Sequence, residues 1–335
     1  MDMAVVGGCL LTGLRDVTDD LTVLDAPGHG RWVVVLPFDA PPVCARFEAG
    51  APVPHRRPSR PTPVPAGAWT SSLDAESFAR GVRTIREAVR DGDVYQVNLC
   101  RRLSAPLPAG FELFGLAAAL AQGNPAPHAA TVHVASAGIE IASASPELFL
   151  RRRGDMVETR PIKGTVAPGR AFLAKDHAEN VMIVDLMRND LGRVCEYGTV
   201  EVPELCREER HPGLAHLVST VRGRLRPGVG WAELLDATLP PGSVTGAPKL
   251  AALEVIRRLE PVPRGVYCGA VGRVDTDTHD GELNVTIRTF WVEDGHLHLG
   301  TGGGITWDST PAGEWEETEL KARRLLSVAA GGGTR

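Results

Sequence analysis

A single lysine lies in a loop whose composition restrains it. Lys163 follows a hydrophobic, strand-like run and stands between Pro161, whose ring fixes its own φ, and Gly164, which accepts either sign of φ and lets a ligand come close. A lysine held in this way can act as a nucleophile once it has lost its proton. Because lysines are mostly exposed and such turns are common, a solvated loop lysine is the alternative interpretation.

Two predicted helices carry carboxylates at a spacing that could serve a cation. Asp176 and Glu179 are three residues apart in the helix predicted over 175–186, and Glu314 and Glu317 share one face of a C-terminal helix. If the two faces meet across a cleft, they can hold a hard divalent cation such as Mg²⁺, which prefers one or two carboxylates together with water and substrate oxygens. Spacing alone does not bring the faces together, and solvated acidic faces are the common case.

A glycine-rich run precedes the C-terminal helix. Gly302, Gly303 and Gly304 offer backbone N–H groups that a phosphate or a carboxylate could accept, although such a run is more often a flexible turn. Thr310 and Pro311 then predict the start of the helix, since proline is favoured at the first helical position.

Length and composition limit the class of protein. The 335 residues can form one large domain or two packed lobes, and 43% hydrophobic residues are usual for a globular protein. A net charge of −5 argues against an electrostatic nucleic-acid or membrane binder. We find no apolar run of about 18 residues and no signal-peptide pattern, so we expect a cytoplasmic protein. The six scattered cysteines form no C-x-x-C pair, and we expect free thiols without a zinc site.

The proline-rich stretch over 50–68 divides the chain. Proline excludes helix and central strand there, so we predict an extended connector. A β segment that includes a strand over 31–36 precedes it. We therefore predict a reduced N-terminal β segment with its connector over 1–68 and the main, catalytic domain over 69–330.

The main domain mixes helices with strands. Asp74 can cap a helix whose apolar residues recur at helical spacing until Asp91-Gly92. Residues 131–134 and 139–142 are strand-like, and the alternation over 283–290 predicts a strand before a hairpin turn at Asp294-Gly295.

Together these segments resemble the chorismate-utilising enzymes, and most closely component I of aminodeoxychorismate synthase. The resemblance covers about residues 72–328. The motifs that carry it are, in chain order, Asp93–Leu99, Ser145–Phe149, Arg160–Thr165, Glu179–Gly192, His216–Ser219, Gly242–Lys249, Gly269–Gly272, Gly302–Ile305 and Glu314–Lys321.

The resemblance implies an α/β fold of the α+β type, with two lobes whose mixed, largely antiparallel sheets face each other and whose helices lie outside. It implies that Glu179 and Glu317 bind Mg²⁺, which grips the ring carboxylate of chorismate, with Glu314 and Asp176 supporting them or bridging through water. The residues implied to contact the rest of the substrate are Gln96, Ser243, Thr245, Tyr267, Arg288, Gly302, Gly304 and Lys321. His216 lies where the family places a histidine beside the reacting ring; a core histidine is the alternative.

Two positions favour one subfamily. Members that add water to chorismate have a lysine base where this chain has Gln96, and glutamine cannot deprotonate water, so we expect ammonia as the incoming group. Anthranilate-forming members typically carry alanine where this chain has Lys163. A lysine there can attack C2 while the C4 hydroxyl departs with Glu147 as general acid, and ammonia then adds at C4 to give 4-amino-4-deoxychorismate.

This chemistry sets opposite requirements on the two side chains. The pKa of Lys163 must fall, through desolvation or a neighbouring cation, of which Arg160 is the nearest in sequence. The pKa of Glu147 must rise, because a general acid has to hold its proton near pH 7.

The chain also departs from the family pattern. The region before Tyr95 is short, the serine motif that binds tryptophan in feedback-controlled relatives is missing, and no glutaminase elbow occurs. Tryptophan inhibition is therefore not expected, and ammonia from glutamine requires a separate glutamine amidotransferase subunit. The alternatives are anthranilate synthase component I, a related enzyme of secondary metabolism, and a non-catalytic homologue, which should have lost part of the set Glu147, Lys163, Glu179 and Glu317. The pathway, folate by way of p-aminobenzoate or an antibiotic precursor, stays open.

Overall fold

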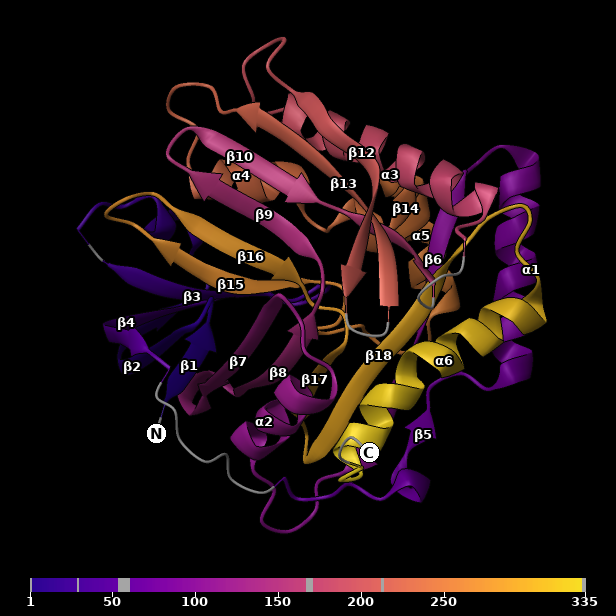
Figure 1. The fold of residues 1–335 in the computed structure, drawn as a ribbon, viewed down its shortest axis with the longest axis horizontal. Coiled ribbons are helices and arrows are strands. Elements are labelled where there is room, and N and C mark those ends of the chain that lie inside the picture. The colour runs from indigo at the N-terminus through magenta and orange to yellow at the C-terminus, as the bar shows by residue number, and fades with distance from the viewer. Residues whose placement is uncertain (1, 29, 54–60, 167–170, 212–213, 333–335) are drawn as a thin grey trace.

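Antiparallel strands dominate the computed structural model, which describes residues 2–28, 30–53, 61–166, 171–211 and 214–332 (Figure 1). The helices are α1 Ala75–Asp91, α2 Leu113–Gly123, α3 Ala174–Gly192, α4 Trp231–Thr238, α5 Lys249–Leu259 and α6 Pro311–Ala329, with 3₁₀ turns η1 Leu21–Leu24, η2 Ala66–Ala68, η3 Ala135–Ala137 and η4 Gly242–Val244. The strands are β1 Met3–Val6, β2 Cys9–Thr18, β3 Arg31–Leu36, β4 Val43–Pro52, β5 Thr70–Ser71, β6 Gln96–Pro106, β7 His128–Val134, β8 Ile139–Ser145, β9 Leu148–Arg153, β10 Met156–Arg160, β11 Ile162–Val166, β12 Glu201–His211, β13 Leu214–Arg224, β14 Gly246–Ala247, β15 Ala270–Asp275, β16 Gly281–Val285, β17 Thr289–Glu293 and β18 His296–Ile305.

Hydrogen bonds join these strands into one 18-stranded network. From one end, β12 pairs with β13, then the path runs through β10, β9, β16, β15 and β3. It continues through β4, β2, β1, β7, β8, β17 and β18 to β6, where β5 and β14 also pair. Every pair among the described strands is antiparallel. The expected α/β fold with largely antiparallel strands is confirmed, although the two expected sheets are linked through β1–β4, and the division at residue 68 stays a prediction.

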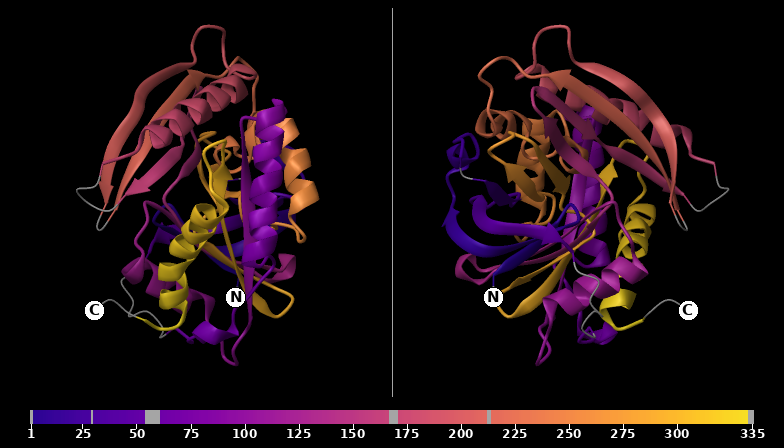
Figure 2. Two further views of the ribbon diagram at one scale, coloured as in Figure 1. Left: turned by 90° about the vertical axis from the view of Figure 1, so that its right-hand side faces the viewer. Right: turned by 60° about the vertical axis from the view of Figure 1, so that its left-hand side comes forward.

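The helices lie outside the sheet, as expected (Figures 1 and 2). Helix α3 packs on β13 and β11, whereas α6 packs on β18 and contacts α1 and α2. The long strands β6 and β18 run side by side over ten residue pairs and cross the middle of the molecule. Because α3 and α6 begin near the ends of β11 and β18 in sequence, both helix N-termini follow directly from strands that carry predicted site residues.

The helix starts follow the predicted capping chemistry. Asp74 accepts a hydrogen bond from the Ser77 N–H at 2.7 Å and caps α1, which ends at Gly92 with φ 84°. Thr310 accepts from the Gly313 N–H at 3.3 Å and caps α6, and Pro311 occupies the first turn. The predicted starts of α1 and α6 and the predicted end of α1 are therefore confirmed, whereas the helix predicted over 175–186 is α3, which continues to Gly192.

Two expectations need correction. The alternating run over 283–290 is two strands, β16 and β17, because residues 286–288 leave the ladder and Arg288 adopts φ 51°. In the connector, the 3₁₀ turn Ala66–Ala68 interrupts the extended chain where proline is missing, and residues 54–60 of that prediction lie outside the described residues. The strands predicted around 31–36, 131–134 and 139–142 are confirmed as β3, β7 and β8.

All six cysteines carry free thiols. Among the described residues, no helix is long and apolar enough to cross a membrane.

Candidate active site

The structure brings Lys163 and Glu147 to one residue, Ser243. The Lys163 amine donates to the Ser243 carbonyl oxygen at 3.1 Å, and the Ser243 side chain lies close enough to the Glu147 carboxyl to lower its pKa. Glu147 lies between β8 and β9 and is 3% exposed. Lys163 lies on β11, and Ser243 belongs to the turn η4 that follows α4. Three segments distant in sequence therefore meet at this point.

Burial moves the pKa values of both side chains in the directions that the predicted chemistry requires. Desolvation raises the pKa of Glu147 to about 7, against the opposing effects of the Ser243 hydrogen bond, Lys163 and Arg288. Desolvation also lowers the pKa of Lys163, with Glu179 opposing this change and Lys321 adding to it. Lys163 is only half-buried as a residue, but its pKa depends on the surroundings of the amine, and these are buried. The two shifts favour a protonated acid and an uncharged amine.

Arg160 is not the cation that acts on Lys163. Its guanidinium is paired with Glu209 on β12, and it lines a cavity of about 280 Å³ together with Pro146 and Ile162. Pro146 and Ile162 are the chain neighbours of the two catalytic candidates, but neither Glu147 nor Lys163 lines this cavity. The nearby cation is Lys321 of α6, which sequence order could not reveal.

The two acidic helix faces meet, as the metal prediction requires. Glu179 of α3 and Glu317 of α6 interact electrostatically, and Glu317 does so with Glu314 as well. Burial raises the pKa values of Glu179 and Glu314. The neighbouring Glu317 carboxylate adds to the increase in both. The side chain of Glu317 is 43% exposed, and its carboxylate lies 2.7 Å from the Lys321 amine. The effect of burial on this carboxyl is outweighed by that of Lys321, so the pKa of Glu317 is lowered. Glu314 is almost fully buried, so this face of α6 is more than solvated surface.

The carboxylate cluster has the chemistry to hold a divalent cation. One Glu314 oxygen accepts a hydrogen bond from Ser309 at 2.6 Å, whereas the other is buried without a hydrogen-bond partner and lies next to Gly303. Among the described residues, no group of three or more histidine, cysteine or acidic side chains is placed so that it could hold a metal ion by itself. Mg²⁺ needs only one or two carboxylates, because water and substrate supply the remaining oxygens. Asp176 has a different contact, since its carboxylate accepts from the Leu173 N–H at 2.8 Å and caps α3.

Gln96 is buried with an unpaired amide. Neither its oxygen nor its nitrogen has a hydrogen-bond partner, and the Oδ1 atom of Asn98 nearby on β6 is also unpaired. Both amides lie over Gly304 of β18, where an added Cβ would stand 1.7 Å from Gln96 Nε2 and 3.1 Å from Asn98 Oδ1. The pair offers two buried oxygens that can accept hydrogen bonds from a small N–H donor.

The glycine run is a strand and not a flexible turn. Gly302, Gly303 and Gly304 belong to β18 and pair with residues 98–100 of β6. A Cβ on Gly302 would meet Cys100 Sγ at 2.5 Å, so the close approach of the two strands requires glycine. The Gly302 carbonyl oxygen accepts from the Lys321 amine at 2.9 Å, which brings α6 onto this strand.

The remaining predicted residues are distributed around this centre. Arg288 faces Glu147, and Thr245 follows Ser243 with its hydroxyl bonded to its own turn. His216 is buried in β13, opposite Thr165 of β11. The substrate contacts of these residues stay predictions.

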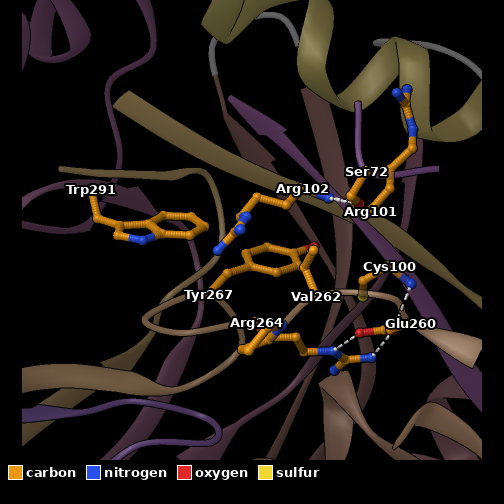
Figure 3. Close-up of a pocket in the computed structure, with 11 residues that line it drawn as sticks. Ser72, Cys100, Arg101, Arg102, Glu260, Val262, Arg264, Tyr267 and Trp291 are labelled. Atoms are coloured by element: carbon orange, nitrogen blue, oxygen red, sulfur yellow. Dashed lines mark hydrogen bonds and ion pairs between the residues drawn. The ribbon is translucent and has the colours of Figure 1, made fainter. Parts of the chain in front are cut away.

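Tyr267 lies apart from the catalytic pair. It is buried over Gly300 of β18 and lines a small pocket with Cys100 and Arg264, where Arg264 is paired with Glu260 at 2.6 Å (Figure 3). Burial raises its pKa well above the usual range. Its predicted contact with substrate stays a prediction.

One positioning contact was not expected from the sequence. Asn180, next to Glu179 on α3, donates to the Leu217 carbonyl oxygen at 3.1 Å and accepts from the Ser219 hydroxyl. Leu217 is the β13 residue opposite Lys163 of β11. Asn180 therefore ties the helix of a predicted metal ligand to the strand beside the lysine. The sequence indicated Asn180 only through its place in the Glu179–Gly192 motif. The position of a polar residue within a helix does not reveal which residue it binds.

Comparisons with known proteins identify the family. A family model described as chorismate binding enzyme matches residues 39–327. The chain belongs to this family. It is 41% identical over 296 residues to anthranilate synthase component 1 of Streptomyces coelicolor, covering 83% of this chain and 57% of that protein. It is also 41% identical over 272 residues to aminodeoxychorismate synthase component 1 of Klebsiella aerogenes, covering 77% of this chain and 59% of that one.

A solved structure supports the fold independently. A putative 2,3-dihydroxybenzoate-specific isochorismate synthase from Bacillus anthracis superposes with a TM-score of 0.80 over 98% of this chain and 95% of that chain, at 24% identity. At that identity the likeness concerns the fold alone. The family resemblance that the motifs indicated is confirmed, and the chain spans less than 60% of the length of the two curated relatives.

Proposed function

We propose that this protein aminates chorismate at C4 and forms 4-amino-4-deoxychorismate, as component I of an aminodeoxychorismate synthase. The observation that carries the proposal is the Lys163 amine, which shares Ser243 with the buried acid Glu147. An amine of lowered pKa beside a carboxyl that holds its proton supplies a nucleophile and an acid to one substrate.

In the proposed reaction, the Lys163 amine forms a bond to C2 of chorismate. Both ring double bonds shift, from C1=C2 to C1=C6 and from C5=C6 to C4=C5, and the C4 hydroxyl leaves as water with the proton of Glu147. Ammonia then bonds to C4, the bond to lysine breaks, and the enolpyruvyl group is retained. The amide oxygens of Gln96 and Asn98 can accept N–H groups of ammonia, and neither side chain can deprotonate water.

Glu179 and Glu317 would hold Mg²⁺, with Glu314 beside them. When bound, Mg²⁺ supplies positive charge for the ring carboxylate of chorismate. The raised pKa values of Glu179 and Glu314 support this assignment, because they reflect buried carboxylates with too little cationic charge nearby. Glu317→Gln removes one negative charge at nearly constant size and should shift the Mg²⁺ titration of chorismate binding to higher concentrations. An unchanged titration would contradict the assignment.

Ammonia is proposed to come from a separate glutamine amidotransferase subunit, so the purified chain should use ammonium but not glutamine. Its rate at fixed total ammonium should rise with pH while ammonium loses its proton, until the loss of the Glu147 proton opposes this rise. Turnover with glutamine in ammonium-free buffer would contradict the proposal.

Anthranilate formation is the second candidate, since anthranilate synthase relatives are as similar as aminodeoxychorismate synthase relatives. Incubation with chorismate, Mg²⁺ and ammonium, followed by mass spectrometry with and without an added p-aminobenzoate-forming lyase, distinguishes the two. A product that the lyase converts to p-aminobenzoate supports C4 amination. Anthranilate without lyase would replace the proposal by the second candidate.

A further inference from the structure

The turn η4 lies against the first residues of β6 and is bound there by Asn98. The Asn98 N–H donates to the Thr245 carbonyl oxygen at 2.7 Å, and Asn98 Nδ2 donates to the Ser243 carbonyl oxygen at 3.2 Å. The same Ser243 oxygen accepts from the Lys163 amine at 3.1 Å. The position of the amine therefore depends on where this turn is held.

A buried arginine also joins these two segments. Arg264 Nη1 donates to the Val244 carbonyl oxygen at 2.8 Å, and Arg264 Nη2 donates to the Asn98 carbonyl oxygen at 2.9 Å. Val244 directly follows Ser243, so Arg264 and Asn98 bind consecutive carbonyl groups of the turn. Because Arg264 also binds Asn98 itself, the contacts form a closed circuit. Movement of Ser243 away from β6 would break several of these hydrogen bonds together.

The guanidinium group of Arg264 is held by other segments in turn. Glu260 accepts from its Nε at 2.8 Å and from its Nη2 at 2.6 Å, and Glu260 also accepts from the Cys100 N–H of β6 at 2.9 Å (Figure 3). The guanidinium carbon lies 4.4 Å from the centre of the Phe38 ring, and the Arg264 N–H donates to Asp39 at 2.8 Å. Phe38 and Asp39 follow β3, so the N-terminal β segment reaches η4 through Arg264.

Arginine suits this position better than lysine. A planar guanidinium presents its N–H groups in several fixed directions, so it can serve one carboxylate and two carbonyl oxygens at once, whereas a lysine ammonium is a compact charge on a flexible stem. The contacts of Arg264 therefore use the geometry of arginine as well as its charge.

We propose that Arg264 is a positioning residue for Lys163. By tying η4 to β6, it fixes the Ser243 carbonyl oxygen to which the amine is bound. The inference rests on the proposed function for the use of this amine as a nucleophile.

The test is Arg264→Lys, which keeps a positive charge for Glu260 but cannot span both carbonyl oxygens. Chorismate and Mg²⁺ are added without ammonium, and mass spectrometry follows the adduct on Lys163, which has gained chorismate and lost water. We expect the maximal rate of adduct formation to fall about 10- to 100-fold. The chorismate concentration that gives half the maximal rate should stay that of wild type, because substrate binding is not affected. An unchanged maximal rate would overturn the inference.

A second variant addresses the same contact by a milder change. In Glu260→Gln the guanidinium loses one of the two carboxylate oxygens that orient it, and adduct formation should slow in the same way. Far-ultraviolet circular dichroism shows which variants are folded, and a wild-type rate in either folded variant would contradict the proposal. Arg152→Lys is the matched control, since Arg152 is also buried and donates to a carbonyl oxygen, that of Gly154, at 2.8 Å. An equal loss of rate in this control would show a general effect of arginine replacement and would overturn the inference.

Hydrogen exchange separates this inference from the proposed function, because it needs no substrate. Peptides that cover η4 and the start of β6 should exchange faster in Arg264→Lys than in wild type and in Arg152→Lys. Equal exchange in all three proteins would mean that Arg264 does not hold the turn. A wild-type protein that forms no adduct would instead refute the proposed use of Lys163, and the exchange measurement would still decide whether Arg264 holds η4.

Discussion

Replacing Glu147 by glutamine should abolish activity and yet make the protein more stable at high pH. Glutamine keeps the size of the protonated side chain but has no proton to donate, so general acid catalysis is lost. Stability responds differently, because burial penalises the ionised carboxylate and glutamine never ionises.

The magnitude follows from the pKa of this carboxyl. It is raised from the usual 4.5 to about 7, so the folded protein binds more protons than the unfolded chain between these values. The free energy of unfolding of the wild type therefore falls as pH rises from 4.5 towards 7. Each pKa unit corresponds to about 1.4 kcal/mol, so the full effect is about 3 kcal/mol above pH 7.

The measurement is urea unfolding of wild type and Glu147→Gln at about pH 4.5 and about pH 8. The difference in unfolding free energy, variant minus wild type, should increase by about 3 kcal/mol between the two conditions. Glu316→Gln, at an exposed position of α6, serves as the control and should show no such increase. A difference that does not depend on pH, or that decreases with pH, would refute the reasoning that burial keeps Glu147 protonated.

Three further predictions concern other parts of the molecule. Lys163→Ala should abolish C4 amination while the far-ultraviolet circular dichroism stays that of wild type; unchanged product would remove the lysine from the mechanism. Gly304→Ala should reduce turnover strongly, because the new Cβ would stand 1.7 Å from Gln96 Nε2, and wild-type kcat would show that this amide can move away freely. Asp190→Ala should lower the free energy of unfolding by about 3–5 kcal/mol, since it leaves the partly buried Lys249 without the carboxylate now 2.7 Å away. Denaturant unfolding measures this change, and a decrease in unfolding free energy below about 1 kcal/mol would contradict the prediction.

The sequence by itself determined the local secondary structure and the side chains available for catalysis. Asp74 and Gly92 have the chemistry of helix caps. Asp74 begins α1 and Gly92 ends it, as predicted, because capping involves only neighbouring backbone groups. The Pro161–Gly164 segment and the acidic helix faces likewise indicated Lys163, Glu179 and Glu317, since their spacing is a local property. The predicted loop around Lys163 was wrong, because residues 162–166 form strand β11 against β13.

Only the tertiary structure decided which of these groups act on one another. Arg160 is three residues from Lys163 but is paired with Glu209 and lines a cavity that Lys163 does not line, whereas Lys321, far along the chain, supplies the nearby positive charge. The glycine run became part of β18 because β6 lies against it. Ser243 acquired its two contacts through packing of η4 between segments that meet only in the folded chain. Charge and hydrogen bonding depend on distances in space, and sequence order fixes these only over a few residues.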